Sequence, residues 1–257
     1  MTEPLLELED VTKHFGGVVA NEGVTFSIEQ GEIVGLIGHN GAGKTTLFNI
    51  IGGYLKPDMG RITFQGEDIT GLTPARIARK GVVRTFQATT LFNRMTVYQN
   101  VSLAHYLSIK KPFWSYILNT RGVRSSEREI HRRTESLIEL FNLSEFHNVP
   151  AQSLPYGLQK CVGVAIAMAA KPVLLMLDEP VAGMNETESK EMTYHIRRIK
   201  DSGVTLLIIE HDMKTLMSIT NRVVAMAWGQ KLAEGTPSEI QRNESVIESY
   251  LGKDEDW

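Results

Sequence analysis

The sequence predicts an α/β domain with a largely parallel core sheet and an inserted helical subdomain. Short apolar runs, typical of strands buried on both faces, recur between helical patterns along most of the chain. Between about residues 88 and 152 no strong run of this kind occurs, and a charged helical pattern replaces it. The chain has 257 residues, which is enough for one large domain of this class.

The expected strands share an apolar, largely β-branched composition, and turn residues lie near several of them. They are Leu5 to Val11, Val24 to Ile28, Ile33 to Ile37, Val82 to Phe86, Val173 to Leu177, Val204 to Ile209 and Val223 to Met226. Gly16-Gly17 and Gln30-Gly31 mark turns near the first two strands. The continuous apolar run from Ile33 to Ile37 is the kind expected at the centre of a parallel sheet.

The middle of the chain predicts helices. Ser125 to Phe141 carries apolar residues at helical spacing, while charged residues occupy most of the remaining faces. Residues 112–120 are rich in aromatic side chains but lack this period, and we interpret them as an irregular or short helical insert. We therefore expect a helical subdomain over residues 88–170 inside a single domain of residues 1–257, ending in a helix from Gln159 to Ala170.

Composition limits the classes of function. The formal net charge is −3, which argues against wholesale nucleic-acid binding. The single cysteine, Cys161, excludes an intramolecular disulfide framework and fits a reducing compartment. No segment approaches the roughly 18 consecutive apolar residues of a membrane-spanning helix. The N-terminal residues show no secretory signal, so we expect a soluble protein whose membrane role comes through a partner.

The strongest motif is a glycine-rich loop that matches the pattern G-x4-G-K-[ST]. It comprises Gly38, His39, Asn40, Gly41, Ala42, Gly43, Lys44 and Thr45, and Thr46 opens the helical run that follows. Backbone amides of such a loop surround a polyphosphate, the lysine places positive charge on it, and the hydroxyl of Thr45 suits Mg²⁺. The strand before the loop and the helix after it favour an ATP site at a helix N-terminus.

A second motif ends the apolar run from Val173 to Leu177. Two adjacent carboxylates, Asp178 and Glu179, follow this strand and lie at the carboxyl edge of the predicted sheet, where ligands of open α/β folds bind. Asp178 suits the Mg²⁺ shell. Glu179 is the natural group to orient and deprotonate an attacking water molecule. The alternative is a pair of unrelated surface carboxylates.

These two motifs resemble the ATPase subunits of ABC transporters, and the likeness covers nearly the whole chain. The resemblance implies the P-loop NTPase fold of ABC ATPases, with an antiparallel β part at the N-terminus. It places Phe15 on the adenine ring, although a core phenylalanine is the alternative. It also assigns Gln87 to the γ-phosphate and Mg²⁺, and His211 to the γ-phosphate, so that both join Glu179 in catalysis.

Ser153 to Lys160 occupies the position of the family's signature motif, where Tyr156 and Gly157 would meet nucleotide held by the opposite subunit. This chain departs from the family here, because Pro155 replaces the serine whose hydroxyl would bind the γ-phosphate. Proline also lacks an N–H group, although it is tolerated near a helix start. We therefore expect this chain to bind the nucleotide of the opposite subunit more weakly. The alternative is sequence drift with little effect on binding.

Within the family, the chain is similar to the ATPase subunits of branched-chain amino acid importers. Three segments carry this likeness, Val83 to Gln87, Ile209 to Met213, and Tyr250 to Gly252. Pro180 to Asn185 also resembles that group. Importers of urea or short amides share these features, so the transported solute stays open.

The resemblance implies partners for ATP-driven transport: transmembrane permease subunits, a second ABC ATPase in a homodimer or heterodimer, and a separate solute-binding protein. The chain would then work at the cytoplasmic face of the membrane. One alternative is a soluble ABC ATPase that acts on ribosomes or DNA, a class that usually carries paired cassettes or long coiled-coil insertions. The other is a regulatory subunit with low turnover, against which an intact Glu179 argues.

Overall fold

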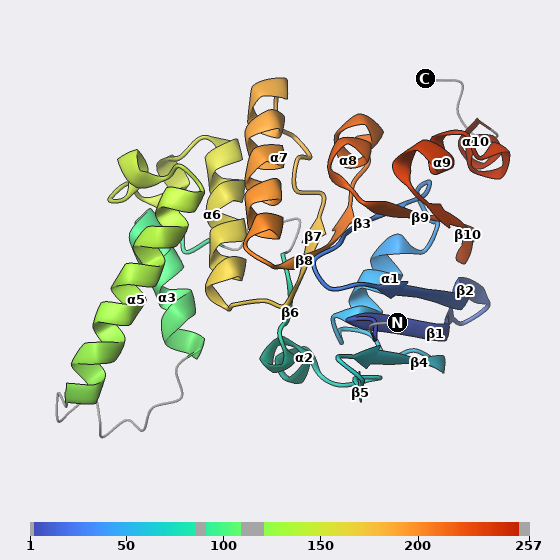
Figure 1. Cartoon of the computed structure of the whole chain (residues 1–257), viewed down its shortest axis with the longest axis horizontal. Coiled ribbons are helices and arrows are strands. Elements are labelled where there is room, and N and C mark those ends of the chain that lie inside the picture. Colours follow the sequence, from blue (N-terminus) through green and yellow to red (C-terminus); the bar gives the residue numbers. More distant parts are fainter. Residues whose placement is uncertain (1–2, 86–90, 109–120, 252–257) are drawn as a thin grey trace. The chain divides into compact units, whose positions relative to one another are not determined.

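The computed structural model describes residues 3–85, 91–108 and 121–251, and within it the chain divides into two compact units. The first comprises Met1–Arg84, Val173–Ala182 and Ile199–Trp257, and the second comprises Thr85–Pro172 and Gly183–Arg198. Figure 1 shows the ribbon coloured along the sequence. The insert expected at residues 112–120 lies outside the described residues.

The first unit contains two sheets. The antiparallel sheet has the order β2-β1-β4-β5 and consists of β1 (Leu6–Phe15), β2 (Val18–Ile28), β4 (Met59–Phe64) and β5 (Glu67–Asp68). The core sheet has the order β10-β9-β3-β8-β7-β6. It consists of β3 (Ile33–Ile37), β6 (Val82–Arg84), β7 (Leu174–Asp178), β8 (Thr205–Ile209), β9 (Arg222–Ala227) and β10 (Gln230–Gly235). All its pairings are parallel except that of β10 with β9, which confirms the predicted mostly parallel core sheet and antiparallel N-terminal part.

One face of the core sheet builds the main hydrophobic core. Alternate residues of the central strands, such as Val34 and Leu36 of β3, lie in this core because successive side chains of a strand point to opposite faces. Helix α1 (Lys44–Ile51) adds Leu47 and Phe48, and the antiparallel sheet closes the core from the far side. Figure 1 shows α1 between the two sheets. Phe48 is fully buried, and truncating such a side chain to alanine costs about 3–5 kcal/mol of stability.

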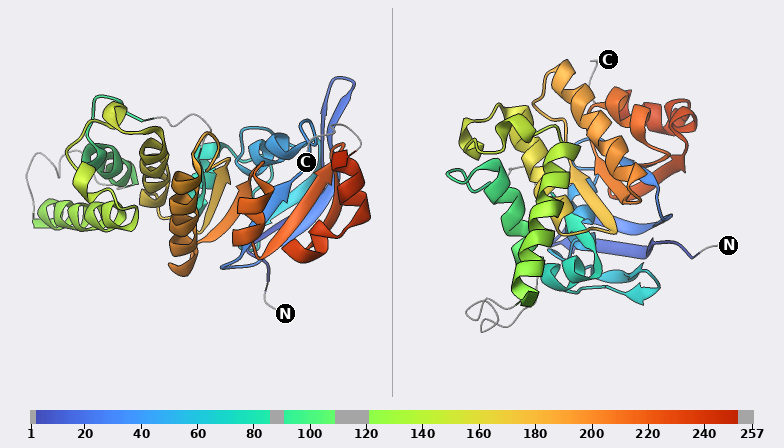
Figure 2. Two further views of the ribbon diagram at one scale, coloured as in Figure 1. Left: turned by 90° about the horizontal axis from the view of Figure 1, so that it is seen from above. Right: turned by 60° about the vertical axis from the view of Figure 1, so that its left-hand side comes forward.

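The opposite face of the core sheet is covered by C-terminal helices. Helix α8 (Met213–Ile219) packs on β3, where a Cβ at Gly35 would lie 3.0 Å from a methyl carbon of Leu216. Helices α9 (Pro237–Gln241) and α10 (Glu244–Leu251) contact β10, and Figure 2 shows them on the same side as α8. Helix α2 (Pro74–Lys80) contacts β6.

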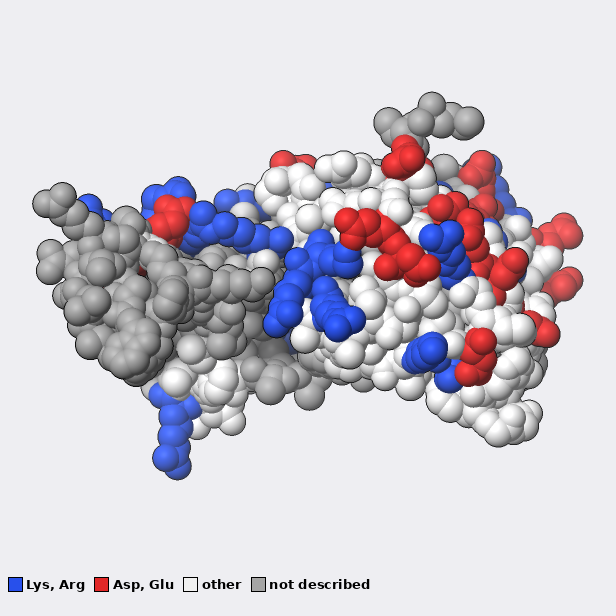
Figure 3. Space-filling model, turned by 90° about the horizontal axis from the view of Figure 1, so that it is seen from below, with Lys and Arg blue, Asp and Glu red and all other residues white. Residues whose placement is uncertain are grey.

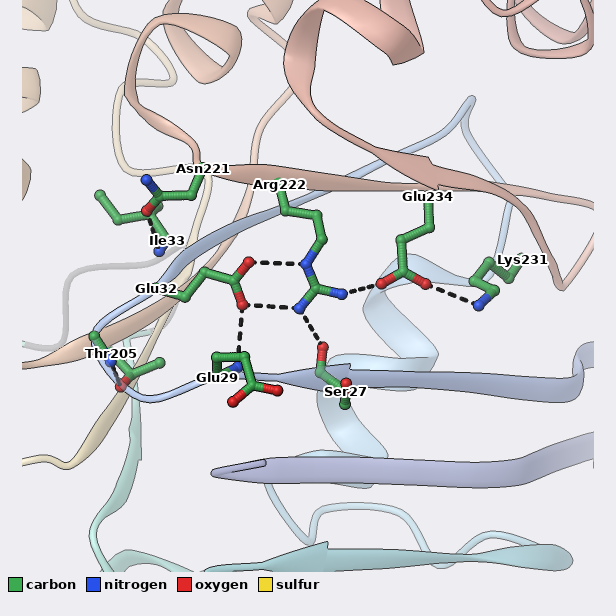
Figure 4. A network of polar contacts seen from close by, with 10 residues as sticks. Ser27, Glu29, Glu32, Ile33, Thr205, Asn221, Arg222, Lys231 and Glu234 are labelled. Carbon is green, nitrogen blue, oxygen red and sulfur yellow. Dashed lines mark hydrogen bonds and ion pairs between the residues drawn. The ribbon is translucent and has the colours of Figure 1, made fainter. Parts of the chain in front are cut away.

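Arg222 ties the sheets of the first unit together (Figure 4). Its guanidinium donates two 2.8 Å hydrogen bonds to the carboxylate of Glu32 and one of 2.7 Å to the carbonyl of Ser27 in β2, and it also pairs with Glu234 of β10. Burial opposes the ionisation of Glu32, but the hydrogen bonds from Arg222 and from the Glu29 amide outweigh it, so the pKa of Glu32 is lowered.

The second unit is helical. It contains α3 (Val97–Ser108), α5 (Arg121–Leu140), two short 3₁₀ segments, η1 (Ser144–Phe146) and η2 (Ala151–Ser153), and α6 (Tyr156–Ala169). Helices α3, α5 and α6 contact one another, and the expected apolar stripe of α5 is buried at Ile130 and Ile138. Helix α7 (Glu186–Asp201) begins in this unit and ends in the first. The helical unit therefore includes residues 183–198, which lie outside the subdomain expected over residues 88–170.

The surface carries charges of both signs. On the face drawn in Figure 3, basic and acidic side chains lie near one another. On α2, Lys80 pairs with Glu67 of β5, while Arg76 and Arg79 are exposed. Among the described helices, none is both long enough and apolar enough to cross a bilayer.

Candidate nucleotide site

The glycine-rich loop connects β3 to α1 in the first unit. Its backbone packs so tightly that a side chain would not fit at either end: a Cβ at Gly38 would lie 2.3 Å from the carbonyl of Met226, and one at Gly43 would lie 2.3 Å from the carbonyl of Ala20. Both glycines have positive φ values, 152° and 96°, which L side chains rarely adopt. Asn21 of β2 supports the loop by donating to the Gly43 carbonyl at 3.2 Å. The loop is therefore a rigid backbone cradle at a helix N-terminus.

Lys44 brings positive charge into this cradle. Its Nζ donates hydrogen bonds to the carbonyls of Gly38 at 2.5 Å and His39 at 3.1 Å, and the residue is only 6% exposed. Burial lowers the pKa of Lys44, and the nearby carboxylates of Glu179 and Asp178 oppose that shift. A buried cation beside open backbone amides favours a polyanionic ligand.

Thr45 and Thr46 follow Lys44 in the first turn of α1. Thr45 is exposed and Thr46 is half-buried. The structure therefore places Thr45 at the exposed start of α1, on the same turn as Lys44.

The other candidate residues converge on the same edge of the core sheet. Strand β8 lies between β3 and β7, and all three run parallel. Asp178 is the last residue of β7 and Glu179 follows it, and His211 follows β8 after one intervening residue. Because the carboxyl ends of parallel strands meet at one edge, these side chains and the loop after β3 share one site. The structure thus brings Lys44, Asp178, Glu179 and His211 together within the first unit.

Glu179 and His211 form a direct pair. Oε1 of Glu179 lies 2.8 Å from Nε2 of His211, and the two side chains are 19% and 50% exposed. Glu179 has a φ of 50°, and its N–H donates to the carbonyl of Ile209 at 2.9 Å, which ties the carboxylate-bearing residue to the end of β8. Left-handed backbone at a non-glycine residue is sparsely populated and is enriched at functional sites.

Asp178 pairs instead with Arg84, the last residue of β6. Nη2 of Arg84 lies 2.7 Å from Oδ2 of Asp178, and both side chains are nearly buried, at 7% and 5% exposed. The guanidinium also donates to Asn49 of α1 at 2.6 Å and lies over the rings of Phe48 and Tyr54. Arg84 of β6, itself hydrogen-bonded to Asn49 of α1, therefore fixes the carboxylate of Asp178 next to the loop.

The donor set fits a magnesium ion that is shared with phosphate. Mg²⁺ commonly takes one or two protein oxygen ligands and completes its shell with phosphate oxygens and water. Asp178 and Thr45 offer two such oxygens beside the loop. Within the described residues, no cluster of three or more histidine, cysteine or acidic side chains could bind a metal ion by itself.

Phe15 lies at the end of β1, in the hairpin that joins β1 to β2. It is 47% exposed, which argues against the alternative of a core phenylalanine. Lys13 Nζ lies 5.6 Å from the centre of its ring. The ring therefore presents an accessible aromatic face, as stacking on a base requires.

The signature segment belongs to the helical unit. Helix α6 begins at Tyr156 with Pro155 as its N-cap, and this proline contributes no side-chain hydrogen bond to the helix end. Tyr156 is 47% exposed, and a Cβ at Gly157 would lie 2.9 Å from the carboxylate of Glu188. The first amides of α6 thus form a helix N-terminus that carries partial positive charge. Gln87 lies outside the described residues.

Sequence reasoning assigned no role to two residues that touch this site. Arg84 pairs with Asp178, and Glu210 accepts hydrogen bonds from the backbone N–H groups of Val181 and His211. Glu210 carries the same signal as Asp178, an acidic residue directly after an apolar run of strand length. For Arg84 the available signal is a charged residue inside an expected strand, three positions before Gln87.

Comparison with known proteins identifies the family. A family model described as "ABC transporter" matches residues 21–182, and one described as "Branched-chain amino acid ATP-binding cassette transporter" matches residues 230–256. The chain is 42% identical to the "High-affinity branched-chain amino acid transport ATP-binding protein BraF" of Pseudomonas aeruginosa, over 98% of this chain and 100% of that protein. It is 41% identical to the corresponding LivG protein of Escherichia coli, over the same shares.

A solved structure agrees with these sequence relatives. The ADP conformation of MJ1267, an ATP-binding cassette of an ABC transporter, superposes with a TM-score of 0.85 at 30% identity, over 98% of this chain and 100% of that chain. The predicted fold and family are confirmed. This chain belongs to the ABC transporter family and is an ATP-binding cassette subunit of that family.

Proposed function

We propose that this chain hydrolyses ATP with Mg²⁺ to drive the import of branched-chain amino acids, working at the cytoplasmic face of the membrane through permease subunits. The names of the relatives from P. aeruginosa and E. coli support the solute class, as does the family model that matches residues 230–256. Urea or a short amide is the alternative solute.

One observation carries the proposal: a buried lysine, two carboxylates and a histidine meet at the carboxyl ends of three adjacent parallel strands. This arrangement contains a group for each part of the reaction. The amides of the loop from Gly38 to Thr45 and the ammonium of Lys44 bind the phosphates, and the exposed ring of Phe15 stacks on adenine.

Hydrolysis requires a water molecule placed in line with the γ-phosphate. Glu179 accepts a proton from this water, and His211, which is paired with Glu179, orients the carboxylate and contacts the γ-phosphate. When bound, Mg²⁺ offsets the charge on the phosphate oxygens. Thr45 and Asp178 would hold it, and Arg84 fixes the side chain of Asp178. Gln87 is assigned to the same ion and to the γ-phosphate.

Dimerisation completes the site. The first amides of α6, at Tyr156 and Gly157, meet nucleotide bound by the opposite ATPase subunit, which is either a second copy or a related chain. The helical unit between residues 88 and 152 meets the permease. ATP closes the dimer, hydrolysis opens it, and the motion passes to the membrane subunits, which receive solute from a separate binding protein.

Copurification followed by reconstitution tests the proposal. The tagged chain is isolated from membranes, its partners are identified, and the assembly is placed in vesicles with its solute-binding protein. We expect permease subunits among the partners and ATP-dependent uptake of leucine, isoleucine or valine, which Glu179→Gln abolishes. Uptake of urea but not leucine would support the alternative solute, and the absence of membrane partners would contradict the transport role.

A further inference from the structure

Glu210 is a nearly buried carboxylate between the two segments that carry the hydrolytic groups. It follows β8 directly and is only 3% exposed. Its Oε1 accepts a 2.7 Å hydrogen bond from the N–H of Val181, and its Oε2 accepts a 3.0 Å hydrogen bond from the N–H of His211. One side chain therefore binds the backbone after β7 and the backbone after β8.

These two contacts link the turn that contains Glu179 to the backbone of His211. Glu179 precedes Val181 by two residues, and its own N–H donates to the carbonyl of Ile209. The turn that starts at Glu179 is closed by a 3.3 Å hydrogen bond from the N–H of Ala182 to the Glu179 carbonyl. Glu210 thus anchors the far side of this turn and the backbone of His211 at once, which limits how the two side chains can move relative to each other.

The charge and shape of the carboxylate matter for this role. A carboxylate has two acceptor oxygens, and hydrogen bonds to an ionised acceptor are roughly twice as strong as neutral ones. A glutamine would keep one acceptor oxygen, but its NH₂ group would face an N–H donor. Burying a carboxylate is costly unless hydrogen bonds compensate. The N–H groups of Val181 and His211 supply two such hydrogen bonds to Glu210.

We propose that Glu210 is a positioning residue for ATP hydrolysis, holding Glu179 and His211 at the separation needed to act on one water molecule. This inference rests on the proposed function of that pair. Glu210 does not touch the reacting atoms, and it acts through the backbone of Val181 and His211.

Steady-state kinetics of Glu210→Gln in the full chain, assembled with its partners, test the inference. Misplacing a reacting group by about 1 Å costs about 100-fold in rate. We therefore expect kcat to fall by about 10- to 100-fold while the Kd for ATP changes by less than about 2-fold. Combining Glu210→Gln with His211→Ala should lower kcat no further than His211→Ala alone, because both changes disrupt the same pair.

Thr205→Val is the matched control. Thr205 is fully buried at the other end of β8, where its hydroxyl accepts a 2.9 Å hydrogen bond from Gly31. Losing that bond should lower the melting temperature without changing kcat. If Glu210→Gln behaves like Thr205→Val, Glu210 has only a structural role and the inference is wrong. Activity retained in Glu179→Gln would instead contradict the proposed function itself.

Amide hydrogen exchange of the parent protein provides a second test that needs no variant. If Glu210 holds both donors, the amides of Val181 and His211 should exchange as slowly as those of β8. Exchange of either amide as fast as in an exposed loop would overturn the inference even if Glu210→Gln fails to fold.

Discussion

The imidazole of His211 and the carboxylate of Glu179 lie 2.8 Å apart, although 31 residues separate them in the sequence. They meet because β7 and β8 are parallel neighbours, so that the residues after each strand emerge at the same edge. The histidine gives the carboxylate a fixed orientation before any water is bound. This relationship places the proposed base and its orienting group within one unit of the chain.

The buried pair of Arg84 and Asp178 predicts a large effect on stability. Arg84→Met removes the cation and leaves a carboxylate that is only 5% exposed, and breaking a buried pair from one side costs about 3–5 kcal/mol. Arg61→Met is the control, because Arg61 and Asp68 form an exposed pair worth about 0–1 kcal/mol. Urea denaturation measures both. Equal losses in the two variants would show that the Arg84 pair contributes no more than a surface contact.

The exposed ring of Phe15 predicts a loss of affinity without a loss of stability. Phe15→Ala should weaken ATP binding by about 1–3 kcal/mol, the range for base–aromatic stacking. Because the ring is 47% exposed, the melting temperature without nucleotide should hardly change. Val18→Ala, at a 66% exposed position in the same hairpin, controls for a general effect on the hairpin. Unchanged ATP affinity in Phe15→Ala would remove the residue from the adenine site.

Pro155 predicts a weak contact to the partner's nucleotide. Pro155→Ser supplies the missing hydroxyl at the N-cap of α6, where serine is also a preferred residue. The ATPase rate should rise by about 10–100-fold in a homodimer if the new bond forms mainly in the transition state. In a heterodimer whose partner carries the serine, the rise should be modest. Pro155→Ala removes the proline ring without adding a hydroxyl, so it separates the two effects. Equal ATPase rates in the parent, Pro155→Ser and Pro155→Ala would show that the proline is harmless.

The contact between Arg222 and Glu32 predicts a pH-dependent stability. The folded-state pKa of Glu32 is lowered, so its contribution is fully present above its ordinary value of 4.5 and is lost as the pH falls through the folded-state pKa. Glu32→Gln removes this titration. The difference in unfolding free energy between parent and variant should therefore narrow as the pH is lowered from 6 towards 3. A constant difference over that range would contradict the assignment.

The sequence was sufficient for the parts of the fold that follow strong local patterns. The strand from Ile33 to Ile37 has the predicted bounds, because five consecutive buried apolar residues between a turn and a glycine-rich loop allow little else. The strand expected from Val82 to Phe86 ends at Arg84, the last residue that pairs with β7; Thr85 is not part of it, and Phe86 lies outside the described residues. Strands β4 and β10 were not predicted, because they are largely exposed and glycine, charged and polar residues interrupt their apolar residues.

In the nucleotide site too, local sequence patterns predicted some features and not others. Motif spacing located the loop and the two carboxylates, since each comes after an apolar run, and the resemblance to the family assigned His211. It did not show which carboxylate would pair with Arg84 and which with His211, because those contacts depend on the order of the strands in the sheet. Sequence reasoning assigned Asn185 no role beyond its place in the segment Pro180 to Asn185, whereas its side chain accepts hydrogen bonds from the amides of Thr187 and Glu188 at the start of α7.

The most direct test of the whole account is Glu179→Gln, which keeps the shape of the side chain and removes its basic carboxylate. ATP affinity and turnover are measured on the same preparation, together with ATP-dependent dimerisation by size-exclusion chromatography. We expect ATP to bind with near-parental affinity and to hold the dimer closed, while turnover falls by at least about 100-fold. ATP hydrolysis at close to the parental rate would show that Glu179 is not the base and would contradict the account.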